Sequence, residues 1–132
     1  MNLYELFLSR YKVFTEIQKL AIPIIENGGN CIIIAPTGSG KTEAAVLPAL
    51  KKVIDSGTVN GISLLYITPL RALNRDMIKR LEDFCNSIGI SIAVRHGDTK
   101  QSERSRQAKK APQMLITTPE TLLQFTNSSL EP

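Results

Sequence analysis

The chain has 132 residues, of which 42% are hydrophobic and 21% are charged, and it contains no low-complexity run. This composition excludes intrinsically disordered, collagen-like and coiled-coil proteins, and it supplies enough apolar side chains for a hydrophobic core. The excess of 16 basic over 12 acidic residues gives a net charge of +4, which permits a polyanionic partner without requiring one.

Membrane and metal-centre functions find little support in the sequence. The longest apolar runs are far too short to cross a bilayer, so no membrane partner is expected. Cys31 and Cys85 lie far apart, and two cysteines are too few for a disulfide framework or a cysteine metal site. Both stand in apolar segments, where we expect them as small buried side chains of a cytoplasmic protein.

Apolar runs alternate with helical patterns along the chain. In chain order, we expect helices over 3–8 and 16–25, a strand over 31–35, a helix over 41–54, a strand over 62–68, a helix over 69–88, a strand over 90–95, a polar basic stretch over 100–110, a strand over 114–117 and a helix from 119 to about 126. Strands without polar alternation, followed by helices, are typical of a parallel sheet covered on both faces. The predicted fold is therefore α/β, with about four parallel strands flanked by helices.

The segment 35–42 carries the strongest chemical signal. Its sequence, Ala-Pro-Thr-Gly-Ser-Gly-Lys-Thr, fits the phosphate-binding loop that connects a buried strand to a helix. Gly38 and Gly40 permit a tight turn whose backbone N–H groups point at a di- or triphosphate. Lys41 would pair with the β and γ phosphates, and the Thr42 hydroxyl would bind Mg²⁺. The competing interpretation is an ordinary glycine-rich turn.

Five segments resemble motifs of superfamily 2 DEAD/DEAH-type ATP-dependent helicases, and they occur in the order of that family. They are 11–18, similar to the Q motif; 37–42, similar to motif I; 68–73, similar to motif Ia; 95–99, a Gly-Asp-Thr segment; and 117–120, similar to motif Ib. The sequences Pro-Leu-Arg-Ala-Leu and His-Gly-Asp-Thr look most like those of the large helicase-related (Lhr) group. The resemblance spans nearly the whole chain. It implies a P-loop NTPase with a RecA-like sheet, ATP and Mg²⁺ as cofactors, and ATP hydrolysis coupled to strand separation.

The resemblance also implies roles for individual residues. Those that it places around ATP are Tyr11, Gln18, Thr37, Gly38, Ser39, Gly40, Lys41 and Thr42. Of these, Lys41 and Thr42 would act in catalysis, Gln18 would read the adenine edge through its amide, and Tyr11 would stack on adenine. Those that it places along nucleic acid are Thr68, Arg71, Thr118 and Glu120.

Several of these residues have a structural alternative. Gln18 is otherwise an exposed helix residue, Tyr11 a packing aromatic residue and Arg71 a solvated helix arginine. Thr118 is also expected to be the N-cap of the last helix, with Pro119 at the first helical position. That capping role is compatible with a phosphate contact, because both use the same helix end.

Two further features of the sequence are polar and basic. The only histidine, His96, has no His or Cys close by in the sequence and is expected to be a polar loop residue. The stretch 100–110 carries five basic residues and one acid, Glu103. It either contacts the phosphates along a nucleic-acid backbone or forms a solvated helix face. It lacks aromatic residues for base stacking.

Helicase chemistry needs more than these motifs. In the family, an Asp-Glu motif holds Mg²⁺ and orients the attacking water, and no Asp-Glu dipeptide occurs in this chain. We therefore expect residues 1–132 to form part of the first RecA-like domain, without the second domain and its arginine fingers. In the family, a later strand lies beside the motif I strand. The strand over 31–35 should therefore lack a neighbour, which predicts weak stability or self-association.

The favoured function is the ATP-binding portion of a helicase whose partner is nucleic acid, DNA rather than RNA. Two alternatives stay open. One is a nucleotide-binding or nucleic-acid-binding module without turnover. The other, less favoured, is a small P-loop kinase, which would need an arginine-rich lid and an acceptor site.

Overall fold

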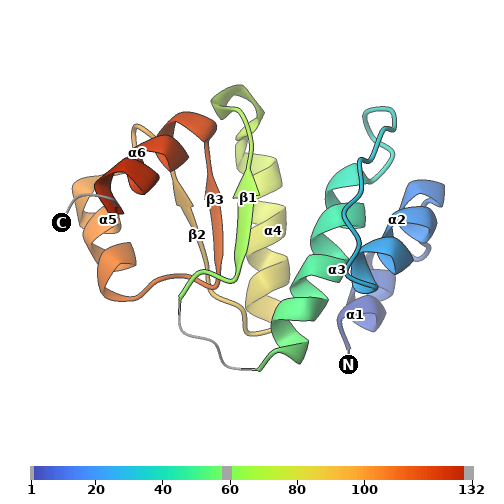
Figure 1. Ribbon diagram of the computed structural model, residues 1–132. Coiled ribbons are helices and arrows are strands. Elements are labelled where there is room, and N and C mark those ends of the chain that lie inside the picture. Colours follow the sequence, from blue (N-terminus) through green and yellow to red (C-terminus); the bar gives the residue numbers. More distant parts are fainter. Residues whose placement is uncertain (1, 58–60, 130–132) are drawn as a thin grey trace. The chain divides into compact units, whose positions relative to one another are not determined.

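The computed structural model describes residues 2–57 and 61–129; for residues 125–129 the description covers the backbone alone. The chain divides into two compact units, residues 1–58 and residues 59–132. The first unit is built from helices, and the second contains a parallel β-sheet (Figure 1). The residues expected around ATP belong to the first unit, and those expected along nucleic acid belong to the second.

Three helices build the first unit. They are α1 (Leu3–Tyr11), α2 (Glu16–Glu26) and α3 (Lys41–Asp55), which confirms the three helices expected there. α1 and α2 each begin with a capping box, in which the side chain of Asn2 or Thr15 accepts a backbone N–H from the next turn. α3 packs on α2 and continues through Pro48, which is buried with the apolar side chains around it. The apolar face of α3 therefore supplies much of the core of this unit.

Residues 31–35 do not form the expected strand. The segment has no regular secondary structure, and no strand pairing in the described chain includes it. Ile32 and Ile34 are 90% and 88% exposed, and Cys31 is exposed rather than buried as expected. Hydrogen bonds to a neighbouring strand hold a strand in place, so an apolar run without that neighbour stays irregular. The expectation of four strands was wrong, and the described residues form three.

The three strands form one parallel sheet in the second unit. They are β1 (Leu64–Ile67), β2 (Ile92–Arg95) and β3 (Met114–Thr117), in the order β1-β3-β2. β3 is central and buried throughout, as its continuous apolar run predicts. The chain crosses from β1 to β2 and then returns to β3. Two right-handed crossovers in opposite directions place their helices on opposite faces of the sheet. In Figure 1, α4 (Arg75–Ser87) covers one face, and α5 (Gln101–Lys109) and α6 (Pro119–Ser129) cover the other.

The expected helix over 69–88 is interrupted. A single 3₁₀ turn, Leu70–Ala72, comes first, and α4 follows after a break. At the break, Asn74 is extended, and its side-chain oxygen accepts the Met77 N–H at 2.8 Å. The apolar spacing continues across the break, but an asparagine side chain that takes a backbone N–H starts a new helix. Arg71 therefore lies in a short turn after β1 and not in the first turn of a long helix.

The remaining elements follow the expectations closely. The strands expected over 62–68 and 90–95 are present in shortened form, and the strand over 114–117 is present with the expected bounds. The basic stretch over 100–110 forms α5, and α6 begins at Pro119. Within the described ranges, no helix has the length and apolarity that a membrane span needs.

Candidate nucleotide and nucleic-acid sites

The segment 36–42 forms a turn that leads into the N-terminus of α3. Gly38 and Gly40 have φ angles of 82° and 85°, a left-handed conformation that glycine adopts without strain. The backbone N–H of Ser39 donates to the carbonyl of Pro36 at 3.2 Å, and the Ser39 hydroxyl donates to the same oxygen at 2.6 Å. Gly40 is the N-cap of α3, and no side chain caps this end of the helix. The first N–H groups of α3 are therefore available to an anion.

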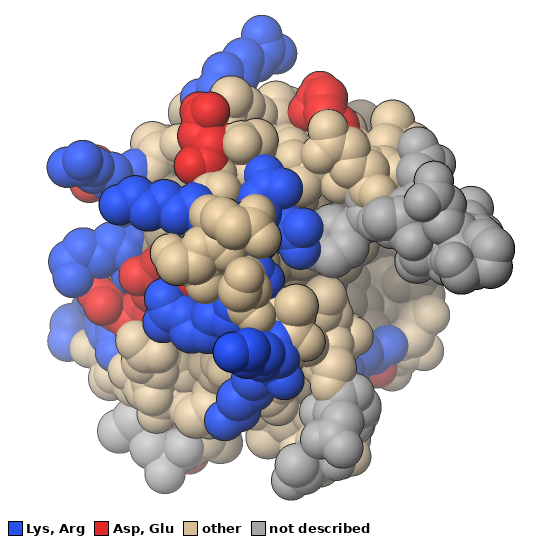
Figure 2. All heavy atoms as spheres, turned by 90° about the vertical axis from the view of Figure 1, so that its left-hand side faces the viewer, with Lys and Arg blue, Asp and Glu red and all other residues tan. Residues whose placement is uncertain are grey.

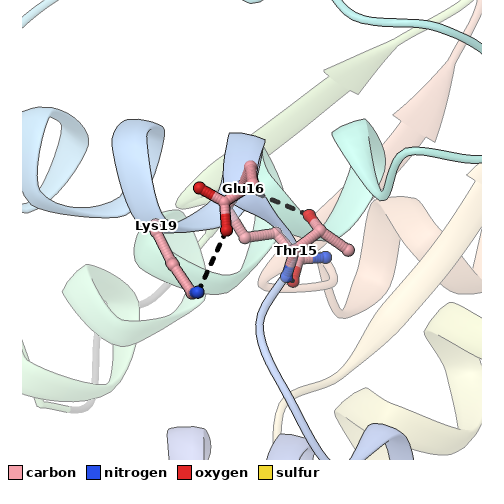
Figure 3. A network of polar contacts seen from close by, with 4 residues as sticks. Thr15, Glu16 and Lys19 are labelled. Carbon is pink, nitrogen blue, oxygen red and sulfur yellow. Dashed lines mark hydrogen bonds and ion pairs between the residues drawn. The ribbon is translucent and has the colours of Figure 1, made fainter.

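Gln18 joins the start of α2 to this turn. It is 2% exposed, so the alternative of an exposed helix residue was wrong. Its Oε1 accepts the Thr15 N–H at 2.8 Å, and its Nε2 donates to the Gly40 carbonyl at 3.2 Å. Figure 3 shows Thr15 at this corner, beside the ion pair of Lys19 with Glu16 at 3.1 Å. The carboxamide oxygen has a second lone pair and the nitrogen a second hydrogen, so the amide keeps capacity for a base.

The turn fits a group that approaches its backbone closely. A Cβ at Gly40 would lie 2.4 Å from Nε2 of Gln18, so no larger residue fits there without displacing this side chain. A Cβ at Gly38 would meet no atom within 4 Å, so the space beside it is open. Lys41, at the first position of α3, is exposed, and Thr42 is partly buried. An ammonium group, a hydroxyl and open N–H groups form the donor set that a nucleotide triphosphate with Mg²⁺ requires.

Tyr11 belongs to an aromatic cluster around α1. Its ring stacks on Phe7 with 4.8 Å between ring centroids, and Phe7 stacks on Phe14 at 5.2 Å. Tyr4 meets Phe14 edge-on at 6.0 Å. The packing role of Tyr11 is therefore observed. Because Tyr11 is also 44% exposed, adenine stacking on its free surface stays a prediction.

In the second unit, two threonines follow neighbouring strands. Thr68 follows β1 and donates its N–H to the carbonyl of Thr117 at 3.0 Å. Thr118 follows β3, and its hydroxyl accepts the Thr121 N–H at 3.4 Å, which confirms its role as the cap of α6. Parallel strands end at the same edge of a sheet, and that edge is where α/β proteins bind ligands. Thr68 and Thr118 therefore lie at one edge suited to a ligand.

The same edge carries the two other residues expected along nucleic acid. Arg71 lies in the 3₁₀ turn after β1, and Glu120 lies in the first turn of α6. Both are exposed, whereas Thr68 and Thr118 are 8% and 3% exposed. The edge thus combines two exposed charged groups with two buried threonines.

Arg104 of α5 organises the loop that follows β2 at this edge. Its Nη2 donates to the carbonyls of His96 and Gly97 at 3.1 and 3.2 Å, and its Nε donates to that of Thr99 at 3.1 Å. Nδ1 of His96 accepts the Asp98 N–H at 3.0 Å, as suits a polar loop residue. In the sequence, Arg104 is only one of the five positive charges of the stretch 100–110. No local pattern distinguishes it, because its partners precede the helix that carries it.

Arg95 adds a second guanidinium group beside this loop. It ends β2 and lies opposite Thr117 in the register, so the two side chains share one face of the sheet. Burial, together with the nearby charge of Arg104, lowers the pKa of Arg95. Thr117 is fully buried, and within the described chain its hydroxyl has no hydrogen-bond partner. The β2 end of this edge is therefore cationic.

Comparison with known proteins connects both sites to one family. Residues 15–131 match the DEAD/DEAH box helicase family. The ATP-dependent helicase Lhr-Core of Sulfolobus acidocaldarius is 45% identical over 127 residues, and that of Methanocaldococcus jannaschii is 41% identical over 140 residues. These alignments cover 87% and 94% of this chain but only 14% and 17% of the relatives. The chain thus spans a small part of the length of the curated relatives that it matches.

Solved structures show the same fold. A hypothetical ATP-dependent RNA helicase from Sulfolobus tokodaii matches with a TM-score of 0.78 and 26% identity, over 99% of this chain and 38% of that one. The Mycobacterium smegmatis helicase Lhr, bound to ssDNA and AMP-PNP, matches with a TM-score of 0.71 and 34% identity, over 91% of this chain and 17% of that one. The predicted α/β, RecA-like class is therefore confirmed, and so is the resemblance to the Lhr group.

Proposed function

This chain belongs to the DEAD/DEAH box helicase family, and we propose that it is the ATP-binding portion of an ATP-dependent nucleic-acid helicase. In the whole protein, ATP hydrolysis would drive translocation and strand separation. The observation that carries the proposal is the uncapped N-terminus of α3, which follows two left-handed glycines and bears Lys41 and Thr42. The exposed thiol of Cys31 suits the reducing cytoplasm in which we propose that the protein works.

Each residue of the turn has a chemical task in this proposal. The N–H groups of the turn and of the first turn of α3 bind the phosphate oxygens, and Lys41 neutralises their charge. The Thr42 hydroxyl would hold Mg²⁺, which supplies further charge neutralisation at the phosphates when it is bound. Lys41 and Thr42 are the proposed catalytic residues. Ser39 holds the turn through its bonds to Pro36, and the exposed Thr37 would contact the phosphates. Gln18 would receive the adenine edge through the free capacity of its amide, and Tyr11 would stack on the base.

The edge of the sheet in the second unit is the proposed contact for nucleic acid. Thr68 would offer its hydroxyl to a phosphate, because its N–H already donates to Thr117. Thr118 would contact the same phosphate backbone, and Arg71 would offer its guanidinium group. Glu120 carries the wrong charge for a phosphate and would accept a hydrogen bond from a base. We propose DNA as the partner, because the M. smegmatis relative and the DUF1998 helicase MrfA were solved with ssDNA or DNA bound.

The test is a calorimetric titration of the 132-residue chain with ATP and Mg²⁺. We expect saturable binding, weakened about tenfold or more in Lys41→Ala because a charge-assisted hydrogen bond to phosphate is lost. Lys52→Ala, near the other end of α3, removes the same charge and should bind like the original chain. Equal affinities in all three proteins, or no binding, would contradict the proposal.

A second candidate function is a binding module without turnover. It is favoured by one observation, the lack of an Asp-Glu dipeptide in the 132 residues. Phosphate release by a chain extended past Pro132, measured with and without single-stranded DNA, separates the two. Release that DNA stimulates supports a motor, and binding of ATP without release supports the module.

A further inference from the structure

The net positive charge of the chain is concentrated in one short segment. Residues 100–110 contain five basic residues and one acid. When these are taken from the totals of 16 and 12, the rest of the chain contains eleven residues of each sign. The segment therefore carries a net charge equal to that of the whole chain, and the rest is balanced. A charge confined to one helix is the footprint of a polyanion contact and not of general solubility.

One face of α5 consists of exposed hydrogen-bond donors. Its four members, spaced at i, i+3, i+4 and i+7, are Ser102, Ser105, Arg106 and Lys109. The inner side of the helix is anchored to the sheet, because Gln107 is 7% exposed and donates from Nε2 to the carbonyl of Val94 at 3.1 Å. The stripe therefore presents hydroxyl, guanidinium and ammonium groups outward from a helix with a fixed orientation.

Among the described residues, the lysines of this segment lack the acid partners that some lysines on other helices have. Three lysines elsewhere each form an ion pair with an acid on the adjoining turn; they are Lys19, Lys51 and Lys79. Lys100, Lys109 and Lys110 have no acid partner in the part of the chain that the structure describes. The single acid of the segment, Glu103, bonds to Arg106 and to Gln107. Three ammonium groups are thus left for a partner outside the chain.

Figure 2 shows the side of the molecule on which α5 and α6 lie. Lys and Arg side chains gather there, and few acids interrupt them. The N-terminal end of α5 adjoins the proposed nucleic-acid edge, because Arg104 holds the carbonyls of His96, Gly97 and Thr99. Lys109 and Lys110 lie at the other end of the helix, so the surface extends away from that edge. A strand that lies along the edge therefore meets one end of this cationic helix and can continue along it.

We propose that the outer surface of α5, formed by its donor stripe with Lys100 and Lys110, binds the phosphodiester backbone of nucleic acid. The inference rests on the proposed function and extends it, because this surface is separate from Thr68 and the other residues assigned to the edge. Ammonium, guanidinium and hydroxyl groups are the donors that bind phosphate oxygens. The segment has no aromatic residue, so the contact reads no base and depends strongly on salt.

The experiment is a fluorescence-anisotropy titration of the 132-residue chain with a labelled oligothymidine of about 20 nucleotides, longer than the site of one small domain. A duplex of the same length is the second probe, and it shows whether the surface takes one strand or two. Salt is varied between about 50 and 200 mM. In Lys109→Gln/Lys110→Gln we expect about tenfold weaker binding at low salt. For the single strand, the slope of log affinity against log salt should be smaller in magnitude by about 1.4.

The matched control is Lys51→Gln/Lys79→Gln, which removes the same charge from α3 and α4. It should keep the original slope. If both double variants weaken binding equally, only the net charge matters and the proposal is overturned. An unchanged slope in Lys109→Gln/Lys110→Gln overturns it as well. Displacement of the oligonucleotide by polyglutamate as readily as by unlabelled DNA would point to an acidic protein partner instead.

This outcome is separable from that of the proposed function. If Lys109→Gln/Lys110→Gln binds DNA with the affinity and salt slope of the original chain while ATP binding is intact, the result counts against the α5 surface alone. Failure of the chain to bind ATP, with a salt slope that still depends on Lys109 and Lys110, counts against the nucleotide site alone. ATP titration of Lys109→Gln/Lys110→Gln should give the affinity of the original chain.

Discussion

The side chain of Gln18 and the backbone of Gly40, 22 residues apart in the sequence, are joined by a hydrogen bond of 3.2 Å. The same Gly40 carbonyl accepts the Ala44 N–H at 3.0 Å, as the first hydrogen bond of α3. Gln18 therefore fixes the residue at which the turn over 36–40 becomes a helix. Since Gln18 is also the residue expected to meet adenine, the base and phosphate parts of the candidate site share one hydrogen bond.

Replacing Gln18 should affect both stability and nucleotide affinity. Gln18→Ala removes the reciprocal half of the capping box of α2 and leaves the partly buried Thr15 N–H without its partner. We expect a loss of about 1 to 3 kcal/mol in the free energy of unfolding, measured by urea denaturation followed by circular dichroism. ATP affinity should fall in the same variant. Gln18→Glu separates the two bonds, because a carboxylate still accepts from Thr15 but does not donate to Gly40. An unchanged unfolding free energy in Gln18→Ala would contradict this role.

Gly40→Ala tests the tight contact directly. The new Cβ would lie 2.4 Å from Nε2 of Gln18, and the backbone angle of +85° disfavours any side chain. Gly57→Ala is the matched control, since Gly57 has a φ of +77° but no atom within 4 Å of a Cβ. We expect the control to lose about 1 kcal/mol through backbone strain alone. Gly40→Ala should lose more, by about 1 to 3 kcal/mol. Equal losses would show that the contact with Gln18 is unimportant.

The helix break at Asn74 gives a prediction for the second unit. Asn74→Ala removes the side chain that accepts the Met77 N–H, and loss of such a cap costs about 1 kcal/mol. Asn86→Ala, at an exposed position near the other end of α4, should leave stability unchanged or raise it slightly, because alanine favours helices. Urea denaturation of both variants provides the comparison. Similar effects of the two substitutions would mean that Asn74 does not determine where α4 begins.

The two cysteines should differ in reactivity. Cys31 is exposed, whereas Cys85 is fully buried, and burial raises the pKa of its thiol from 9.0 to about 12. Thiolates react with disulfide reagents, so at pH 8 we expect rapid modification of Cys31 and modification of Cys85 only after unfolding. In Cys31→Ser, the rapid phase should vanish. Two rapid phases in the original chain would contradict the burial of Cys85.

The raised pKa of the Cys85 thiol also predicts that the stability of the chain depends on pH. An unfolded thiol loses its proton before the buried one as pH rises, so the unfolded state binds fewer protons. The contribution of Cys85 is therefore constant below about pH 9 and becomes destabilising between 9.0 and about 12. The difference in unfolding free energy between the original chain and Cys85→Ala, measured across this range, isolates the effect from other titrating groups. A difference that does not change with pH would count against it.

The exposed segment 31–35 predicts self-association. Ile32 and Ile34 are almost fully exposed and stand in one apolar, β-branched run, which is a template for pairing with another chain. Sedimentation velocity should show association that rises with concentration and falls in Ile32→Ser/Ile34→Ser. Val13→Ser/Leu20→Ser removes two exposed apolar side chains outside this run and should not reduce it. A monomer at all concentrations would contradict the prediction.

Local patterns predicted most of the helices and strands, because caps, apolar spacing and turn residues act within a few positions. The glycine turn before α3, α3 itself and β3 are cases in which the pattern and the structure agree. The strand over 31–35 could not be predicted correctly from its own residues, since a strand depends on a neighbour elsewhere. Gln18 and Arg104 show the same limit within the sites: their type was visible in the sequence, but their partners were not.

The hydrogen bond from Gln107 to the Val94 carbonyl makes the two edges of the sheet unequal. The Ser91 carbonyl accepts the Met114 N–H on β3, and successive carbonyls alternate in direction, so the Val94 carbonyl points away from the sheet. Gln107 fills this outer position, so the carbonyl of Val94 is not open to a further strand on the β2 side. No strand pairs with the outer side of β1 within the described ranges. A fourth strand, from this chain or from another molecule, can therefore be added beside β1 without displacing a side chain that already bonds the strand.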